Sequence, residues 1–112
     1  LLRQVVFNLV LNAVQAVGDS GRVVVSIESA ARGEAVLSVE DNGPGVPADL
    51  REQVFRPYFT THEQGSGLGL AVVRQIVLAH HWAIECTTSD LGGAAFRIAG
   101  VKTLDGEDKT SA

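Results

Sequence analysis

At the centre of the sequence stands the stretch Gly65-Ser66-Gly67-Leu68-Gly69-Leu70, directly ahead of an apolar run that ends near His80. The apolar residues of that run recur at helical steps and predict a helix over about 68–80. Glycines let backbone N–H groups approach a ligand closely, and the first turn of a helix favours an anion. The stretch is therefore either a phosphate-binding loop or a plain loop-to-helix turn, because glycine pairs mark both.

Two common nucleotide motifs do not match this glycine stretch. The Walker motif ends in Gly-Lys-Ser/Thr, which is absent here, and the dinucleotide fingerprint directly follows a strand. The preceding segment, 55–67, shows no periodicity and few apolar residues after Phe59, and we interpret it as a mobile segment. Support for a nucleotide site must therefore come from elsewhere in the chain.

The first segment of the chain is predicted to be an amphipathic helix. Its apolar residues recur at steps of three and four as far as Val17, and Gly18 is well placed to end it. Asn8 and Asn12 are one turn apart, so their side chains share a face. They could cap backbone groups in the core, which is the more common role for such a pair taken alone. Alternatively, an amide oxygen could bind Mg²⁺, which prefers oxygen ligands.

Alternation of apolar and polar residues predicts a first β-hairpin. One strand covers 22–29 and the other about 35–40, with a turn at 30–33. In the first strand, one face is expected to be buried, and it carries Val23, Val25 and Ile27.

The second half of the chain predicts a short helix and another hairpin. Pro47 and a nearby acid favour a short helix over 47–54. Strands follow at 82–88 and 95–101, joined by a Gly92-Gly93 turn. The whole pattern is typical of an α+β fold, a two-layer α/β sandwich whose mostly antiparallel sheet is covered on one face by helices.

The loop Asp41-Asn42-Gly43-Pro44-Gly45 follows the first hairpin. An Asx turn would explain the aspartate. Equally well, its carboxylate could accept a hydrogen bond from the exocyclic amine of a base, with Gly43 and Gly45 making room for a flat ring. From the residues alone, the structural and the base-binding interpretations of Asp41 are equally well supported.

Composition excludes several classes of protein. The 112 residues, 46% of them apolar, suit one domain over 1–101, and the polar residues 102–112 are expected to be a disordered tail. No run reaches the length of a membrane span, and no signal-peptide pattern opens the chain. The net charge of −4 argues against nucleic-acid binding. The single Cys86 excludes an internal disulfide and favours a reducing compartment.

Four segments together resemble the sequence boxes of sensor histidine kinases. Gln4–Ala13 is similar to the N box, Asp41–Gly45 to the G1 box, Val54–Thr61 to the F box and Gly65–Leu70 to the G2 box. Their order and spacing agree with the family over about 1–98. The Phe-Thr-Thr run is most similar to the nitrogen- and oxygen-responsive kinases. The strands that usually precede the N-box helix are missing, so we expect an N-terminally trimmed domain.

The resemblance implies a Bergerat ATP-binding fold with ATP and Mg²⁺ as ligands. By position, Asn12 would coordinate Mg²⁺ and Asn8 would support the phosphates, which makes both of them expected catalytic residues. Asp41 would bind the adenine amino group, with Gly43 and Gly45 lining the ring pocket. The lid and the glycine stretch would add further nucleotide contacts, namely Thr60, Thr61, His62, Gly65, Gly67, Leu68 and Gly69.

The resemblance also implies a function in two-component signal transduction. The domain would donate the γ-phosphoryl group to a histidine on a separate helical dimerisation domain, with a response regulator downstream and a cytoplasmic location. Departures from the family pattern at Arg56, His62 and Ala94 keep a second interpretation open, a nucleotide-binding pseudokinase without phosphotransfer. A third, an ATPase of the gyrase or Hsp90 type, is disfavoured by the short lid over 55–65.

Overall fold

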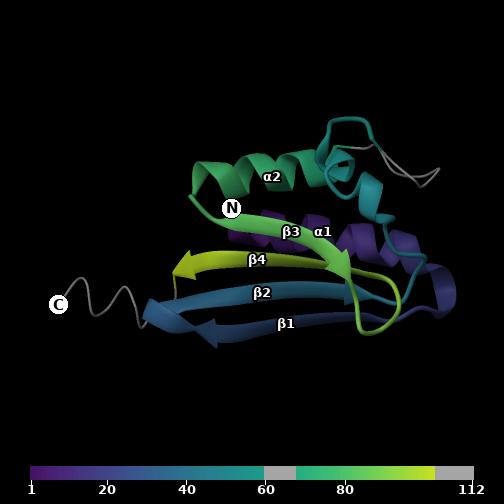
Figure 1. Cartoon of the computed structure of the whole chain (residues 1–112), viewed down its shortest axis with the longest axis horizontal. Helices are drawn as coiled ribbons and strands as arrows, with labels where there is room; N and C mark the ends of the chain where they lie inside the picture. The colour runs from purple at the N-terminus through teal and green to yellow at the C-terminus, as the bar shows by residue number, and fades with distance from the viewer. Residues whose placement is uncertain (60–67, 103–112) are drawn as a thin grey trace.

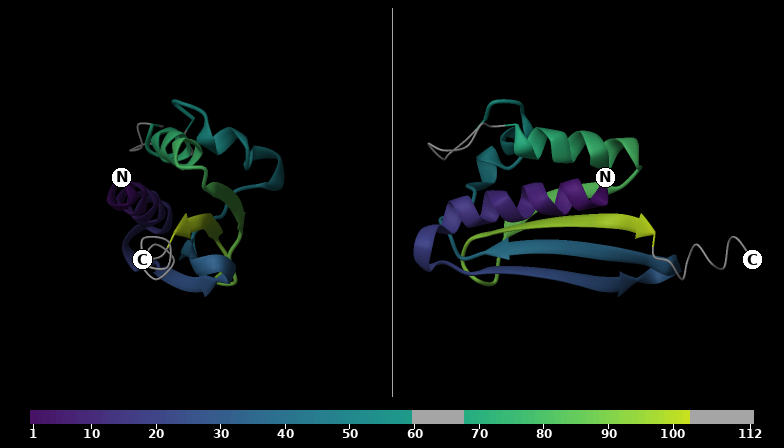
Figure 2. Two further views of the ribbon diagram at one scale, coloured as in Figure 1. Left: turned by 90° about the vertical axis from the view of Figure 1, so that its left-hand side faces the viewer. Right: turned by 180° about the vertical axis from the view of Figure 1, so that it is seen from behind.

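The computed structural model describes residues 1–59 and 68–102. Two helices cover one face of a four-stranded sheet (Figure 1 and Figure 2). The helices are α1 (Leu2–Val17) and α2 (Gly69–Ala79), and the strands are β1 (Val23–Ala30), β2 (Glu34–Asp41), β3 (Ala83–Thr88) and β4 (Ala94–Lys102). The strand order is β1-β2-β4-β3, and each of these neighbours pairs antiparallel. The predicted two-layer α/β sandwich is confirmed.

The hydrophobic core lies between the helices and the sheet. Its members are four apart along each helix and two apart along each central strand, as the two periodicities require. They include Val5, Leu9, Ala13, Val73 and Val77 from the helices, and Leu37, Val39, Phe96 and Ile98 from the strands. This core fixes the ends of α1, α2, β2 and β4 relative to one another.

The prediction that the inner face of β1 is buried is wrong for Val25 and Ile27, which are 45% and 71% exposed. β1 is an edge strand, and the partners of these two residues on β2, Val39 and Leu37, are buried on the same face. The helical layer therefore covers β2 but leaves most of β1 open. Alternation shows which side chains share a face, whereas coverage depends on where the other layer ends.

The segment predicted as a short helix over 47–54 is instead two single 3-10 turns, η3 (Ala48–Leu50) and η4 (Gln53–Phe55). One α-helical turn gains few hydrogen bonds for the residues it orders, so helical propensity is weak over so short a stretch. Burial of Val54 and Phe55 decides the local conformation, with the Phe55 ring edge-on to Phe96 at 6.0 Å between centroids.

Both ends of the last hairpin differ slightly from expectation. His81 adopts a left-handed conformation with φ of 59°, and Trp82 N donates to Val77 O at 2.9 Å to close α2. β4 includes Lys102, whose Nζ lies 3.2 Å from Glu34 Oε2, so the strand runs one residue into the predicted tail. The rest of that tail lies outside the described residues. Neither α1 nor α2 is long and apolar enough to cross a membrane.

Candidate functional site

One end of the sandwich brings together segments that are far apart in the sequence. The end of β2, the turn between β3 and β4, the C-terminal part of α1 and the first turn of α2 all lie at this end (Figure 1). Three of the sequence boxes fall on these segments, so the N box, the G1 box and the end of the G2 box share one region.

Asp41, the last residue of β2, is the buried polar centre of this region, with 1% of its surface exposed. Its Oδ1 accepts two backbone hydrogen bonds, from Gly43 N at 2.9 Å and from Ala94 N at 3.1 Å. The Gly43 contact is the Asx turn that the sequence suggested. The Ala94 contact comes from 53 residues further along the chain. Two donors on one oxygen fix the carboxylate in one orientation and leave Oδ2 as its other acceptor.

Glycines lie around this carboxylate, and at Gly93 a larger residue does not fit. A Cβ built on Gly93 would lie 2.2 Å from Asp41 Oδ1 and 2.6 Å from Gly43 N. Gly45 has φ of 75° and packs against Gly93, where a Cβ would lie 3.5 Å from the carbonyl. The predicted role of Gly43 and Gly45, to make room for a flat ring, stays a prediction, while Gly93 was predicted only as a turn residue.

One face of α1 runs alongside the region. The Asn8 amide donates to Gly69 O at 3.3 Å, at the start of α2, and the Ala16 carbonyl lies against Gly43, where a Cβ would be 3.0 Å away. Asn12 stands midway between them on the same face, half-buried. From Asn8 to Ala16 the face covers eight steps of the helix, or about 12 Å at about 1.5 Å per residue. It therefore links the glycine stretch before α2 to the Asp41 loop.

The two asparagines have different surroundings. Asn8 makes the kind of bond that the capping interpretation requires, from its side chain to a backbone carbonyl. Within residues 1–59 and 68–102, the Asn12 side chain has neither a hydrogen bond nor an ion pair. An amide oxygen without a partner among the described residues, half-buried between the glycine stretch and the Asp41 loop, has the donor chemistry of a Mg²⁺ ligand that shares the ion with water and phosphate.

The first turn of α2 supplies backbone donors. Gly69 begins the helix, and a Cβ there would meet nothing within 4 Å among residues 1–59 and 68–102, so these residues leave the backbone open on that side. The first N–H groups of a helix have no intrahelical acceptor and carry the positive end of its dipole. Leu68 and Gly69 are the described part of the predicted phosphate loop. Thr60, Thr61, His62, Gly65 and Gly67 lie outside the described residues.

Arg51 is a further residue that the sequence did not single out. Its Nε donates to Val46 O at 3.2 Å and its Nη2 to Thr88 Oγ1 at 2.8 Å. The guanidinium thereby ties the loop after Asp41 to the end of β3. Nothing in the local sequence signals these two contacts, because Val46 O is a backbone atom and Thr88 is 37 residues away in the chain. The close packing beside Asp41 had one signal in the sequence, the Gly92-Gly93 pair, because glycines allow backbone segments to approach closely.

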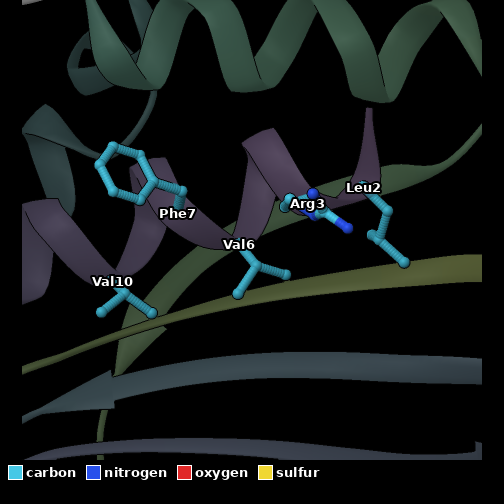
Figure 3. Close-up of a pocket in the computed structure, with 5 residues that line it drawn as sticks. All are labelled: Leu2, Arg3, Val6, Phe7 and Val10. Carbon is cyan, nitrogen blue, oxygen red and sulfur yellow. The ribbon is translucent and has the colours of Figure 1, made fainter.

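A hollow of about 540 Å³ lies elsewhere, on another face of α1 (Figure 3). Four apolar side chains and one cation line it, namely Leu2, Val6, Phe7, Val10 and Arg3. It contains none of the predicted site residues, and its lining has no acceptor for a base amine and no oxygen ligand for a metal. The hollow is therefore separate from the candidate site.

Cys86 on β3 gives a testable pH dependence. Burial raises the pKa of its thiol to about 11, with the Arg51 guanidinium lowering that pKa and the Asp41 carboxylate raising it to smaller extents. The folded protein therefore keeps the Cys86 thiol neutral at pH values where the same thiol ionises in the unfolded chain, whose thiol pKa is the usual 9.0. Its contribution to stability is complete below pH 9 and is lost as the pH rises towards 11.

We expect the free energy of unfolding to fall by about 2 kcal/mol more in the wild type than in Cys86→Ala over this pH range. Denaturant titrations at intervals between pH 8 and 11 measure the difference. Other groups that titrate here are common to both proteins and cancel. Equal losses in the two proteins would contradict the assignment.

Comparisons with known proteins agree with this arrangement. A family model described as histidine kinase-, DNA gyrase B- and HSP90-like ATPase matches residues 1–103. The sensor histidine kinase ZraS of Escherichia coli O157:H7 is 46% identical over 98 residues, covering 87% of this chain and 21% of that protein. The chain thus spans about a fifth of the length of that relative.

Solved structures show the same fold. The catalytic domain of histidine kinase ThkA superposes with a TM-score of 0.81 at 35% identity, covering 94% of this chain and 68% of that one. ThkA has also been solved in complex with the response regulator protein TrrA, with a TM-score of 0.77 at 32% identity, covering 91% and 28%. Full-length ShkA in complex with AMPPNP matches with a TM-score of 0.75 at 34% identity, covering 88% and 21%. The chain belongs to the histidine kinase-, DNA gyrase B- and HSP90-like ATPase family, and it is the catalytic, ATP-binding domain of a sensor histidine kinase.

Proposed function

We propose that this domain binds Mg²⁺-ATP between α1, the Asp41 loop and the start of α2, and donates the γ-phosphoryl group to a histidine on a separate helical dimerisation domain. The observation that carries the proposal is the fixed Asp41 carboxylate, whose second oxygen is left to accept from a base amine. The AMPPNP bound by ShkA, a relative with the same fold, supports a nucleotide ligand.

The base of ATP would lie at one end of the α1 face and the phosphates at the other. Asp41 would accept a hydrogen bond from the adenine amino group, with Gly43 and Gly45 beside the ring. At the other end, the first turn of α2 would donate backbone N–H groups to the phosphates. Asn8 holds that turn against α1 through Gly69 O. Phosphoryl transfer depends mainly on positioning and charge neutralisation, which these groups can supply.

Asn12 is the residue we assign to Mg²⁺. Its side-chain oxygen would be one ligand, with water and phosphate oxygens as the others. When bound, Mg²⁺ neutralises phosphate charge during transfer. Of the remaining predicted contacts, Thr60, Thr61 and His62 in the lid, together with Gly65 and Gly67, keep their proposed part in binding the triphosphate.

The test is a calorimetric titration of ATP with and without Mg²⁺ into the wild type and Asn12→Ala. We expect Mg²⁺ to tighten ATP binding in the wild type, and expect Asn12→Ala to lose about tenfold or more of that gain, as loss of a metal-site residue does. Gln4→Ala, which removes an exposed amide from the same helix, is the matched control. An unchanged Mg²⁺ effect in Asn12→Ala would rule out this ligand assignment.

The proposed partners are a helical dimerisation domain that carries the acceptor histidine and a response regulator downstream. The ThkA–TrrA complex supports the second for a protein of this kind. We place the domain in the cytoplasm, where ATP and the regulator are available. Since the attacking imidazole comes from another domain, the chain alone should bind ATP with little turnover.

A second candidate function is nucleotide binding without transfer, in a regulatory pseudokinase. Ala94 favours it, because the buried methyl group occupies a position where the family commonly has a hydroxyl near the adenine. Supplying a helical acceptor domain together with radiolabelled ATP distinguishes the two functions. A labelled histidine identifies the kinase, whereas sound ATP binding without label identifies the regulatory module.

A further inference from the structure

The turn that joins β3 to β4 contains a buried polar side chain with no role in the proposed function so far. Ser89 is 4% exposed and begins this turn, which runs from Ser89 to Gly93. Its hydroxyl donates to Glu40 Oε1 at 3.0 Å and accepts from Leu91 N at 2.9 Å. A single hydroxyl thus bonds both within the turn and to β2.

These bonds leave the turn little freedom. Gly92 N donates to Ser89 O at 3.0 Å, and Ser89 N donates to Gly93 O at 2.8 Å. In the part of the chain that the structure describes, no other side chain between Ser89 and Gly93 forms a hydrogen bond. Since the turn contains two glycines, its conformation would otherwise be poorly determined.

The same turn sets the position of Asp41. Gly93 N donates to the Asp41 carbonyl at 3.1 Å, and Ala94 N donates to Asp41 Oδ1 at 3.1 Å. The Ser89 acceptor, Glu40, immediately precedes Asp41 on β2. The Ser89 hydroxyl therefore fastens the turn to the strand end that carries Asp41. The turn bonds the Asp41 backbone carbonyl through Gly93 N, and Ala94, the first residue of β4 after the turn, bonds the carboxylate.

We propose that Ser89 is a positioning residue for base selection: its hydroxyl fixes the β3–β4 turn so that the Ala94 N–H occupies one oxygen of Asp41 and the other oxygen faces the base. This inference rests on the proposed function. A carboxylate held in this way accepts from the 6-amino group of adenine and opposes the 6-oxo group of hypoxanthine, which is itself an acceptor. If the turn loosens, the carboxylate can rotate and the selection weakens.

ITP is the probe of choice because its base differs from that of ATP at this ring position and carries no added amine. The quantity to measure is the ratio of the dissociation constants for ITP and ATP, obtained by titration of both nucleotides into each variant. We expect Ser89→Ala to reduce this ratio about three- to tenfold, the range of one or two lost hydrogen bonds. Ser89→Thr, which keeps the hydroxyl, should restore it.

A purely structural role would lower stability without changing the ratio. Ser38→Ala is the matched control, because Ser38 is also buried in this sheet but forms no side-chain hydrogen bond among the described residues. If Ser89→Ala does not fold, Glu40→Ala removes the same link from the other side and should also reduce the ratio. Faster hydrogen exchange at the Ala94 amide, measured by NMR without nucleotide, should accompany either change.

The outcomes separate the two proposals. If Ser89→Ala and Glu40→Ala keep the wild-type ratio while substitution of Asp41 removes it, Ser89 has no part in base selection and the proposed site stands. If substitution of Asp41 also leaves the ratio unchanged, the proposed base contact fails as well.

Discussion

Asp41→Asn is expected to shift the base preference of the site from adenine towards hypoxanthine while leaving the fold intact. The wild-type Oδ1 accepts from Gly43 N and Ala94 N, so the amide of asparagine must place its oxygen there. An amide nitrogen in that position would face two N–H donors. The NH₂ group is therefore directed at the base, where it opposes the amine of adenine and can donate to a 6-oxo group.

The expected loss in ATP affinity is about 10- to 150-fold, the value of a hydrogen bond to a charged group of about 1.5 to 3 kcal/mol. ITP should lose less affinity or gain some. Calorimetric titrations of both nucleotides measure the change, and thermal unfolding checks the fold. Asp41→Ala is the contrasting variant, since it leaves the Gly43 and Ala94 amides without their acceptor and should be less stable. If Asp41→Asn binds ATP as the wild type does, this carboxylate does not contact the base.

Gly93→Ala is expected to damage both stability and nucleotide binding. Its added methyl group would lie 2.2 Å from Asp41 Oδ1, 2.5 Å from Asp41 O and 2.6 Å from Gly43 N. Two of these atoms belong to the backbone and the third is a buried carboxylate oxygen, so none can move away cheaply. We expect a loss of about 3 kcal/mol, at the upper end for an overpacked site, together with loss of ATP binding as Asp41 is displaced.

Gly92→Ala is the control for that prediction. Gly92 has φ of 104° and open space around it, so alanine there strains the backbone without reaching Asp41. Both variants should lose stability, but only Gly93→Ala should lose ATP affinity. Denaturant unfolding and ATP titration of the two proteins measure the difference. Equal ATP affinities in the wild type and Gly93→Ala would show that the clash is relieved without moving the carboxylate.

Much of the fold is encoded in local patterns. The periodicity of α1 and α2 and the alternation in β2 and β4 place the right residues in the core, because a side chain's face follows from its position in the element. The segment at 47–54 is the counterexample. There, burial of Val54 and Phe55 outweighs the tendency to form a helical turn.

In the candidate site, too, some residues can be identified from local sequence and others only from distant contacts. Asn8, Asn12, Asp41 and the glycines can be found from three short motifs, because turn chemistry and helix spacing are local and the motifs resemble those of a known family. Arg51 and Ser89 could not be found in this way, because each acts on a partner distant in the chain, Thr88 for one and Glu40 for the other.

The sequence by itself determined the two helices, the four strands, the inner faces of the helices and central strands, and the family, and it predicted the two ends of the nucleotide site. Only the tertiary structure decided that β1 leaves Ile27 exposed, and that the Asp41 carboxylate is held by donors from both its own loop and the start of β4. The reason is physical. Local preferences depend on neighbours along the chain, whereas coverage of a face and the partners of a buried carboxylate depend on which distant segments pack together.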